Sequence, residues 1–110
     1  MNVDNAKSQM RKGILEYCIM LLLKEKPCYS SDIINRLKEA NLLVVEGTIY
    51  PLLNRLRRDG VLEYEWQESN QGPPRKYFVL SEGGKAALEA MEEAWNEIEY
   101  TIHNIKESHD

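Results

Sequence analysis

An apolar residue recurs at alternating spacings of three and four along the last part of the chain. This is the heptad pattern of a helix that packs along one seam, formed by Leu88, Met91, Trp95, Ile98, Ile102 and Ile105. It predicts one long helix, capped by Ser81 and ending near Lys106. The stripe is about 26 Å long at 1.5 Å per residue, which is long for a small domain to cover alone. We therefore expect it to form a dimer interface, the alternative being packing within the chain, for instance on residues 11–24.

Trp95 is the unusual member of this stripe, because its ring is large and flat. In the middle of a dimer helix, a tryptophan usually belongs to the packed core. It can also line a cavity between two subunits in which an aromatic ligand stacks. The residues alone leave both interpretations open.

The net charge of −4 argues against a nucleic-acid partner until its distribution is considered. Residues 81–110 contain eight acidic residues and two lysines, so residues 1–80 have a net charge of +2. The two cysteines, Cys18 and Cys28, lack zinc spacing and are expected to be structural. The longest apolar run, Ile14 to Leu23, is about half the length needed to span a bilayer. Together with the absence of a signal-peptide pattern in "MNVDNAKSQ", this predicts a cytoplasmic protein without membrane contact.

The order of the predicted elements narrows the fold. Helices are expected at residues 11–24, from Ser30 or Ser31 to Ala40, and from Glu46–Thr48 to the Asp59-Gly60 cap, with an apolar connection at residues 42–45 packed on the core. Alternation in "LEYEWQ" and β-branched and aromatic residues in "KYFVL" predict a hairpin with a long polar tip. The fold is thus mainly α with a small β-hairpin. We expect a winged helix-turn-helix DNA-binding domain at residues 1–80 and a C-terminal dimerisation helix at residues 81–110.

The stretch "VEGTIYPLLNRLRRDG" is the expected recognition helix. One side is an apolar anchor, and the opposite side presents Gly47, Pro51, Asn54 and Arg58, flanked by Tyr50 and Arg55. Asn can pair with adenine and Arg with guanine, while Thr and Tyr can contact the sugar-phosphate backbone. The alternative is an ordinary solvated face. Pro51 fits if the helix begins at Glu46 to Thr48, since little or no hydrogen bonding is then lost, and Gly47 and Thr48 can approach a phosphate.

Four segments closely resemble the PadR family of bacterial transcriptional regulators: "RKGILEYCIMLLL", "YSSDIINRL", "VEGTIYPLLNRLRRDGVLEYEW" and "GPPRKYFVLSEGG". The resemblance spans residues 11–105 and is most specific in "EGTIYPLLNRL" and "GPPRKYFVL". It implies a winged-helix homodimer that binds double-stranded DNA at an inverted repeat and represses a promoter until a small molecule releases it. The single C-terminal helix resembles the short subfamily that includes multidrug-sensing members.

The resemblance also implies which residues act. The DNA-binding positions correspond to Thr48, Tyr50, Asn54 and Arg55 in the helix and to the only basic pair of the hairpin, Arg75 and Lys76. Trp95 matches a tryptophan that lines a pore between subunits in the multidrug-sensing type, and is therefore a candidate contact for a small aromatic effector.

Two other function classes have less support. A winged helix can serve as a protein-interaction module without DNA binding, which would suit the acidic total and would show no salt-dependent affinity for DNA. An enzyme has little support, because His103 and His109 have no nucleophile or metal-ligand pattern around them. We expect no catalytic residues, no metal and no cofactor.

Overall fold

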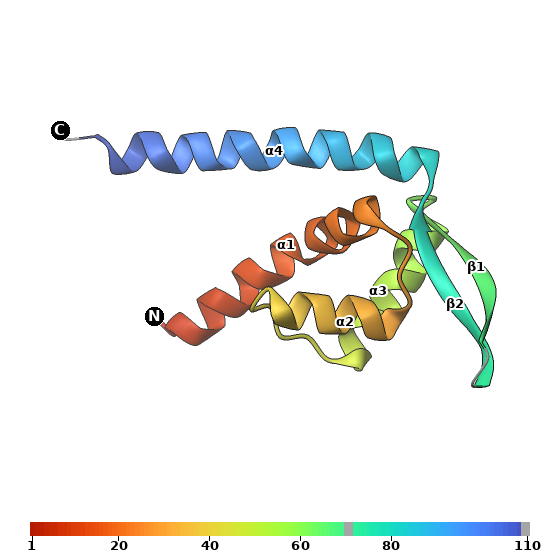
Figure 1. Ribbon diagram of the computed structural model, residues 1–110. Helices are drawn as coiled ribbons and strands as arrows, with labels where there is room; N and C mark the ends of the chain where they lie inside the picture. The colour runs from red at the N-terminus through yellow and green to blue at the C-terminus, as the bar shows by residue number, and fades with distance from the viewer. Residues whose placement is uncertain (70–71, 109–110) are drawn as a thin grey trace.

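The computed structural model describes residues 1–69 and 72–108, so His109 lies outside the described residues. Within these, the chain forms four helices and one two-stranded antiparallel sheet (Figure 1). The elements, in chain order, are α1 (Val3–Glu25), α2 (Ser30–Glu39), α3 (Glu46–Arg58), β1 (Leu62–Ser69), β2 (Gly72–Leu80) and α4 (Glu82–Lys106). This is the predicted mainly α architecture with a hairpin between the third helix and a long last helix.

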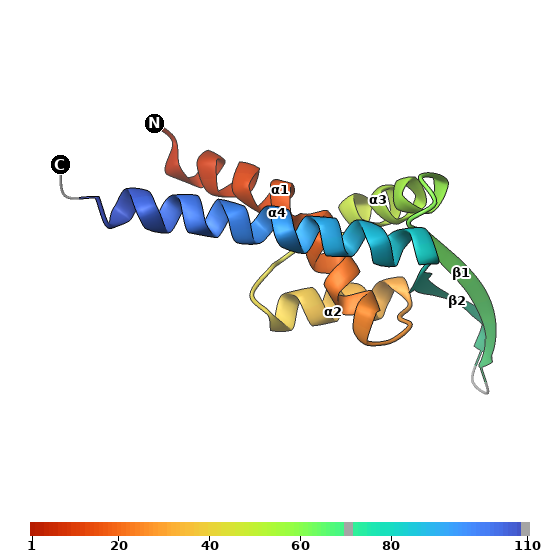
Figure 2. The same cartoon turned by 90° about the horizontal axis from the view of Figure 1, so that it is seen from above.

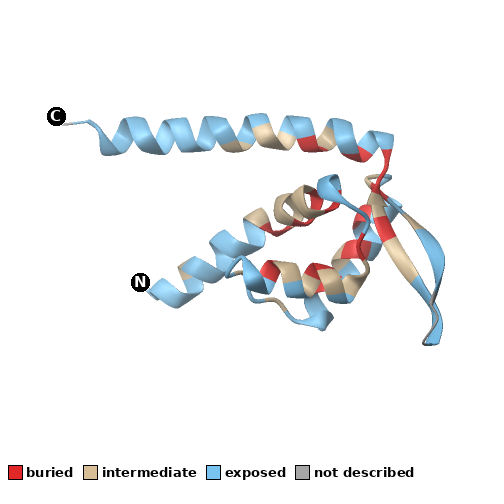
Figure 3. Ribbon diagram, in the orientation of Figure 1, coloured by how far each residue is buried: buried red, intermediate tan, exposed pale blue. Residues whose placement is uncertain are grey.

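The hydrophobic core lies where the first three helices meet the base of the hairpin and the start of α4. Figure 3 shows the buried residues gathered there, while the distal part of α4 is exposed. The side chains with almost no exposed surface come from α1, α2, α3, β1 and the segment before α2: Ile19, Met20, Cys28, Ile33, Ile49, Leu53 and Leu62. Residues 1–80, which contain the expected recognition helix and are here called the reading domain, therefore share one core with the start of α4.

α1 begins earlier than the sequence pattern predicts. The helix starts at Val3 rather than near Arg11, and the Asn2 side chain accepts a hydrogen bond from the Asn5 amide at 3.0 Å. Asp4 in the first turn suits the positive end of the helix dipole. Residues 3–13 are almost entirely exposed, so they carry no apolar periodicity by which the helix could be predicted.

The turn into α2 also differs in detail from the prediction. Tyr29, rather than Ser30 or Ser31, is the N-cap residue, and its amide donates to Asp32 Oδ2 at 3.4 Å. Asn41 follows the end of α2 with φ 69°, and Gly60, the glycine predicted at the helix cap, follows the end of α3 with φ 80°. Both left-handed residues let the chain reverse direction immediately after a helix.

The connection from α2 to α3 is only half packed on the core. Leu42 and Val44 pack against it, as expected, but Leu43 and Val45 are 74% and 70% exposed. Alternate side chains of an extended segment point to opposite sides, so only every second residue of this apolar run can reach the interior.

The hairpin strands extend further into the polar segment than the sequence predicts. Leu62 pairs with Leu80 at the base, and the register continues to Trp66 opposite Lys76 and Gln67 opposite Arg75. Pro73 and Pro74 lie within β2, which is tolerated because this sheet has free edges. Closer to the core, the backbone of Cys28 bridges Phe78 and ties the hairpin to the segment before α2.

α4 is attached to the reading domain through a close backbone contact. The Ser81 hydroxyl donates to the Gly60 carbonyl at 2.6 Å and accepts from the Gly84 amide at 2.9 Å, which caps α4. A Cβ atom on Gly84 would lie 2.0 Å from the Val61 carbonyl oxygen. Only glycine lets α4 start at this distance from the α3–β1 turn.

Replacing Gly84 with alanine should therefore destabilise the fold by about 1–3 kcal/mol or more, because backbone must move to relieve the clash. The matched control is Gly13→Ala in α1, where an added Cβ meets nothing within 4 Å. That change should be neutral or stabilising by up to about 1 kcal/mol, since alanine favours a helix interior. Chemical denaturation of both variants measures the difference, and equal stabilities would contradict this account of the junction.

Candidate nucleic-acid interface

α3 presents a polar face to solvent, as the recognition-helix prediction requires. Ile49, Leu53 and Leu56 are buried, whereas Asn54 and Arg58 are exposed. The helix begins at Glu46, which places Pro51 in its second turn, just past the first. Because proline has no amide hydrogen, the Gly47 carbonyl lacks its usual partner four residues later, and it lies on the exposed face.

Four of the six predicted DNA-binding residues line a single hollow between α2, α3 and β2, with a volume of about 410 Å³. Tyr50 and Asn54 come from α3, and Arg75 and Lys76 come from the hairpin. Ser30 and Ser31, at the start of α2, complete the polar lining. A helix N-terminus, the Arg75 guanidinium and the Asn54 amide thus adjoin one space, and this chemistry suits a phosphate and an adjacent base edge.

Aromatic contacts position the basic side chains of the hairpin. The Arg75 guanidinium lies 4.8 Å from the centre of the Tyr29 ring, and Lys76 Nζ lies 4.3 Å from the centre of the Tyr64 ring. Across the hollow, the Ser30 hydroxyl donates to the Tyr50 hydroxyl at 2.9 Å. These contacts orient the polar groups without burying them, so they remain available to a ligand.

Arg75 and Lys76 are adjacent in β2 and therefore project to opposite faces of the hairpin. Lys76 shares its face with Trp66, which is opposite it in the register and 62% exposed. Sequence reasoning assigned no role to Trp66 or to Arg57, whose guanidinium lies 4.5 Å from the centre of the Tyr64 ring. The alternation in "LEYEWQ" was the signal that placed Tyr64 and Trp66 on one face.

Thr48 and Arg55 lie on the other flank of α3, which faces α1. There they line a hollow of about 500 Å³, here called the α1–α3 groove, with Lys12, Leu15, Glu16, Pro51, Leu52 and Arg58. Arg55 forms an ion pair with Glu16 across this groove. Sequence reasoning missed Glu16, because it occupies an apolar helical run far from Arg55 in the chain.

The C-terminal stripe divides into two parts. Leu88 is buried against the core, and Met91 and Trp95 are partly covered, whereas Ile98, Ile102 and Ile105 are 49%, 46% and 69% exposed. Figure 2 shows α4 crossing α1, and at this crossing the Trp95 and Tyr17 rings lie 6.3 Å apart, centre to centre. Packing within the chain therefore covers the first half of the stripe and leaves the second half exposed.

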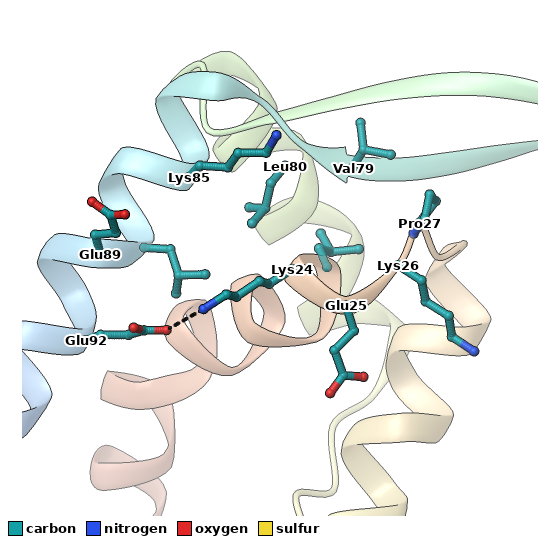
Figure 4. A pocket seen from close by; sticks show the side chains of 11 residues that line it. Lys24, Glu25, Lys26, Pro27, Val79, Leu80, Lys85, Glu89 and Glu92 are labelled. Carbon is teal, nitrogen blue, oxygen red and sulfur yellow. Dashed lines mark hydrogen bonds and ion pairs between the residues drawn. The ribbon is translucent and has the colours of Figure 1, made fainter.

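A separate pocket of about 540 Å³ lies between the end of α1, the end of β2 and the first turns of α4 (Figure 4). Its apolar lining includes Leu23, Leu80 and Leu88, and an ion pair between Lys24 and Glu92, 3.5 Å apart, crosses from α1 to α4. The rim carries three lysines and three glutamates, so its charges balance. The lining residues come from elements other than α3, so this pocket is distinct from the polar face described above.

Other kinds of site have little support in the described part of the chain. Residues 1–69 and 72–108 contain no group of three or more His, Cys, Asp or Glu side chains that could hold a metal ion. Burial raises the pKa of the Cys18 thiol, which keeps it protonated and unreactive at neutral pH. Of the helices in those same ranges, none combines the length and apolar character needed to cross a membrane.

Comparison with known proteins shows which family the chain resembles. Residues 19–90 match the transcriptional regulator PadR-like family. A PadR-like transcription factor from Bacteroides fragilis is 60% identical, with a TM-score of 0.78 over 92% of this chain and 98% of the other. A PadR-like transcriptional regulator from Bacillus cereus is 31% identical, with a TM-score of 0.82 over 92% of this chain and 99% of the other.

A third structure contains nucleic acid. It is PadR from Bacillus subtilis in complex with operator DNA, which is 25% identical, with a TM-score of 0.65 over 71% of this chain and 45% of the other. The match over residues 19–90 includes α2, α3 and the whole hairpin, the elements that carry the polar face. The chain therefore belongs to the PadR-like family of DNA-binding transcriptional regulators.

Proposed function

We propose that this protein is a homodimeric repressor that binds an inverted-repeat operator and is released by a small aromatic effector. α3 enters the major groove and the hairpin contacts the adjacent backbone. Asn54 and Arg55 read base edges, Thr48 and Tyr50 position the backbone, and Arg75 and Lys76 contact phosphates. The observation that carries the proposal is the convergence of α2, α3 and β2 on one polar hollow.

The exposed half of the C-terminal stripe supports a dimer. Ile98, Ile102 and Ile105 follow the heptad spacing beyond the point where α1 covers α4. Three large apolar side chains in one line gain free energy when a second copy covers them. A twofold dimer also matches a palindromic operator, because it presents two recognition helices to successive turns of DNA.

The contact between Tyr17 and Trp95 supports an aromatic effector. Their rings are tilted by 38° and both side chains are only partly buried, so a face of the pair remains accessible. The site lies at the crossing of α1 and α4, next to the exposed stripe. A flat ligand stacked on Trp95 would contact the proposed dimer interface and thereby alter the spacing of the two reading domains.

The DNA-binding role can be tested on a duplex selected for binding from a pool of randomised sequences, with a scrambled version as reference. Asn54→Ala should lose about 1–3 kcal/mol of binding free energy with the selected duplex and little with the scrambled one. Lys76→Ala should weaken binding to both duplexes similarly. It should also lower the slope of log K against log salt concentration by about the value of one phosphate contact. Fluorescence anisotropy at several salt concentrations measures these effects.

The control for lost charge is Lys106→Ala, an exposed lysine in the last turn of α4. It should leave both affinities nearly unchanged. If no selected duplex is preferred over its scrambled version at low salt, the proposed DNA-binding role fails. A stable complex with a protein partner in that case would favour the interaction-module alternative.

The dimer can be tested by placing a charge in the exposed stripe. Ile102→Glu should shift the protein from dimer to monomer, because an unpaired carboxylate cannot be buried in an apolar seam without a large free-energy cost. Tyr100→Glu is the matched control, since Tyr100 is 68% exposed on the same helix but lies off the stripe. Analytical ultracentrifugation distinguishes the two, and a wild-type monomer at micromolar concentration would contradict the proposal.

The effector site can be tested in a Trp66→Phe background, where Trp95 is the only tryptophan. Titration with ethidium, a planar aromatic cation, should quench its fluorescence and saturate, because the dye stacks on the exposed face of the ring. Binding is also followed through the fluorescence of the dye itself. If Trp95→Ala binds the dye with unchanged affinity, Trp95 is not a ligand contact.

A further inference from the structure

The α1–α3 groove is lined by more positive than negative side chains. Lys12, Arg55 and Arg58 provide three positive groups, and the single carboxylate in the lining belongs to Glu16. That carboxylate pairs with Arg55, the residue proposed to read DNA. The arrangement therefore directs a DNA-reading side chain back towards α1 when no DNA is present.

The carboxylate offers Arg55 the same chemistry that DNA offers. A guanidinium donates paired N–H bonds to a carboxylate, to a phosphate, or to O6 and N7 of guanine. Arg55 carries one positive charge, and an N–H group that is bonded to Glu16 is not free to bond DNA. Binding of DNA by Arg55 therefore competes with the pair that it forms with Glu16.

The pair is accessible enough to be exchanged. The side chains of Arg55 and Glu16 are 50% and 36% exposed, so water and salt already weaken their attraction. Arg55 is at the surface and can leave the groove without opening the core. After it leaves, Lys12 and Arg58 remain to neutralise Glu16.

We propose that Glu16 is an intramolecular competitor that lowers the affinity of the protein for DNA by holding Arg55 against α1. This inference rests on the proposed contact between Arg55 and DNA, and assigns a regulatory role to a residue outside the reading surface. Removing the carboxylate should tighten binding, whereas most single changes near a binding surface weaken it.

Glu16→Gln keeps the shape of the side chain and removes its charge. We expect it to bind the selected duplex about two- to fivefold more tightly than wild type, the range that measured exposed ion pairs correspond to. Loss of any negative charge favours DNA slightly, so Glu97→Gln is the matched control, at an exposed position of α4. It should gain distinctly less than Glu16→Gln.

A double-mutant cycle identifies Arg55 as the group being released. In an Arg55→Gln background, Glu16→Gln should gain no more than Glu97→Gln does. A gain that persists without Arg55, or equal gains for the two single glutamate variants in the wild-type background, overturns the competitor role. Those results leave DNA binding itself intact, whereas a wild-type protein that does not prefer the selected duplex overturns the proposed function as well.

Discussion

The contact between the first turn of α4 and the turn after α3 determines how the two functional parts of the molecule are arranged. Ser81 bonds to the carbonyl of Gly60 and to the amide of Gly84, and the Val61 carbonyl occupies the space where a side chain of Gly84 would be. Backbone packs against backbone here, so the junction has little freedom to adjust. The direction of α4 is therefore tied to the end of α3, and the reading helix and the exposed stripe are held in a fixed relation.

Much of this fold could be predicted from local pattern. The apolar positions of α3, its glycine cap and the alternation in β1 each follow from neighbours in sequence, and all are present. The first turns of α1 could not be predicted, because they are almost entirely exposed and show no apolar periodicity, and they are stabilised by the Asn2 cap and by helix propensity. β2 is longer than its sequence pattern predicts, since Pro73 and Pro74 resemble a turn but are tolerated at a sheet edge.

In the candidate site, too, local pattern could predict some features and not others. Asn54, Tyr50, Arg75 and Lys76 could be named from residue type and from family resemblance, and they line one hollow. The pairing of Arg55 with Glu16 depends on the distance between α1 and α3, which no local pattern encodes. Acidic residues also follow a division in space, because α4 carries most of the surplus negative charge and the reading domain is mildly basic. An acidic protein can bind DNA when its charge is separated in this way.

Substitutions in the buried half and in the exposed half of the C-terminal stripe have different consequences. Leu88 is part of the core, so substitutions there alter folding. Ile98, Ile102 and Ile105 lie beyond the core, and their replacement leaves the reading domain closed. After a gene duplication, the outer half of α4 can therefore diverge without loss of the fold. With the exposed stripe as the proposed dimer interface, paralogues that share one reading domain can become insulated from one another through changes in these few side chains.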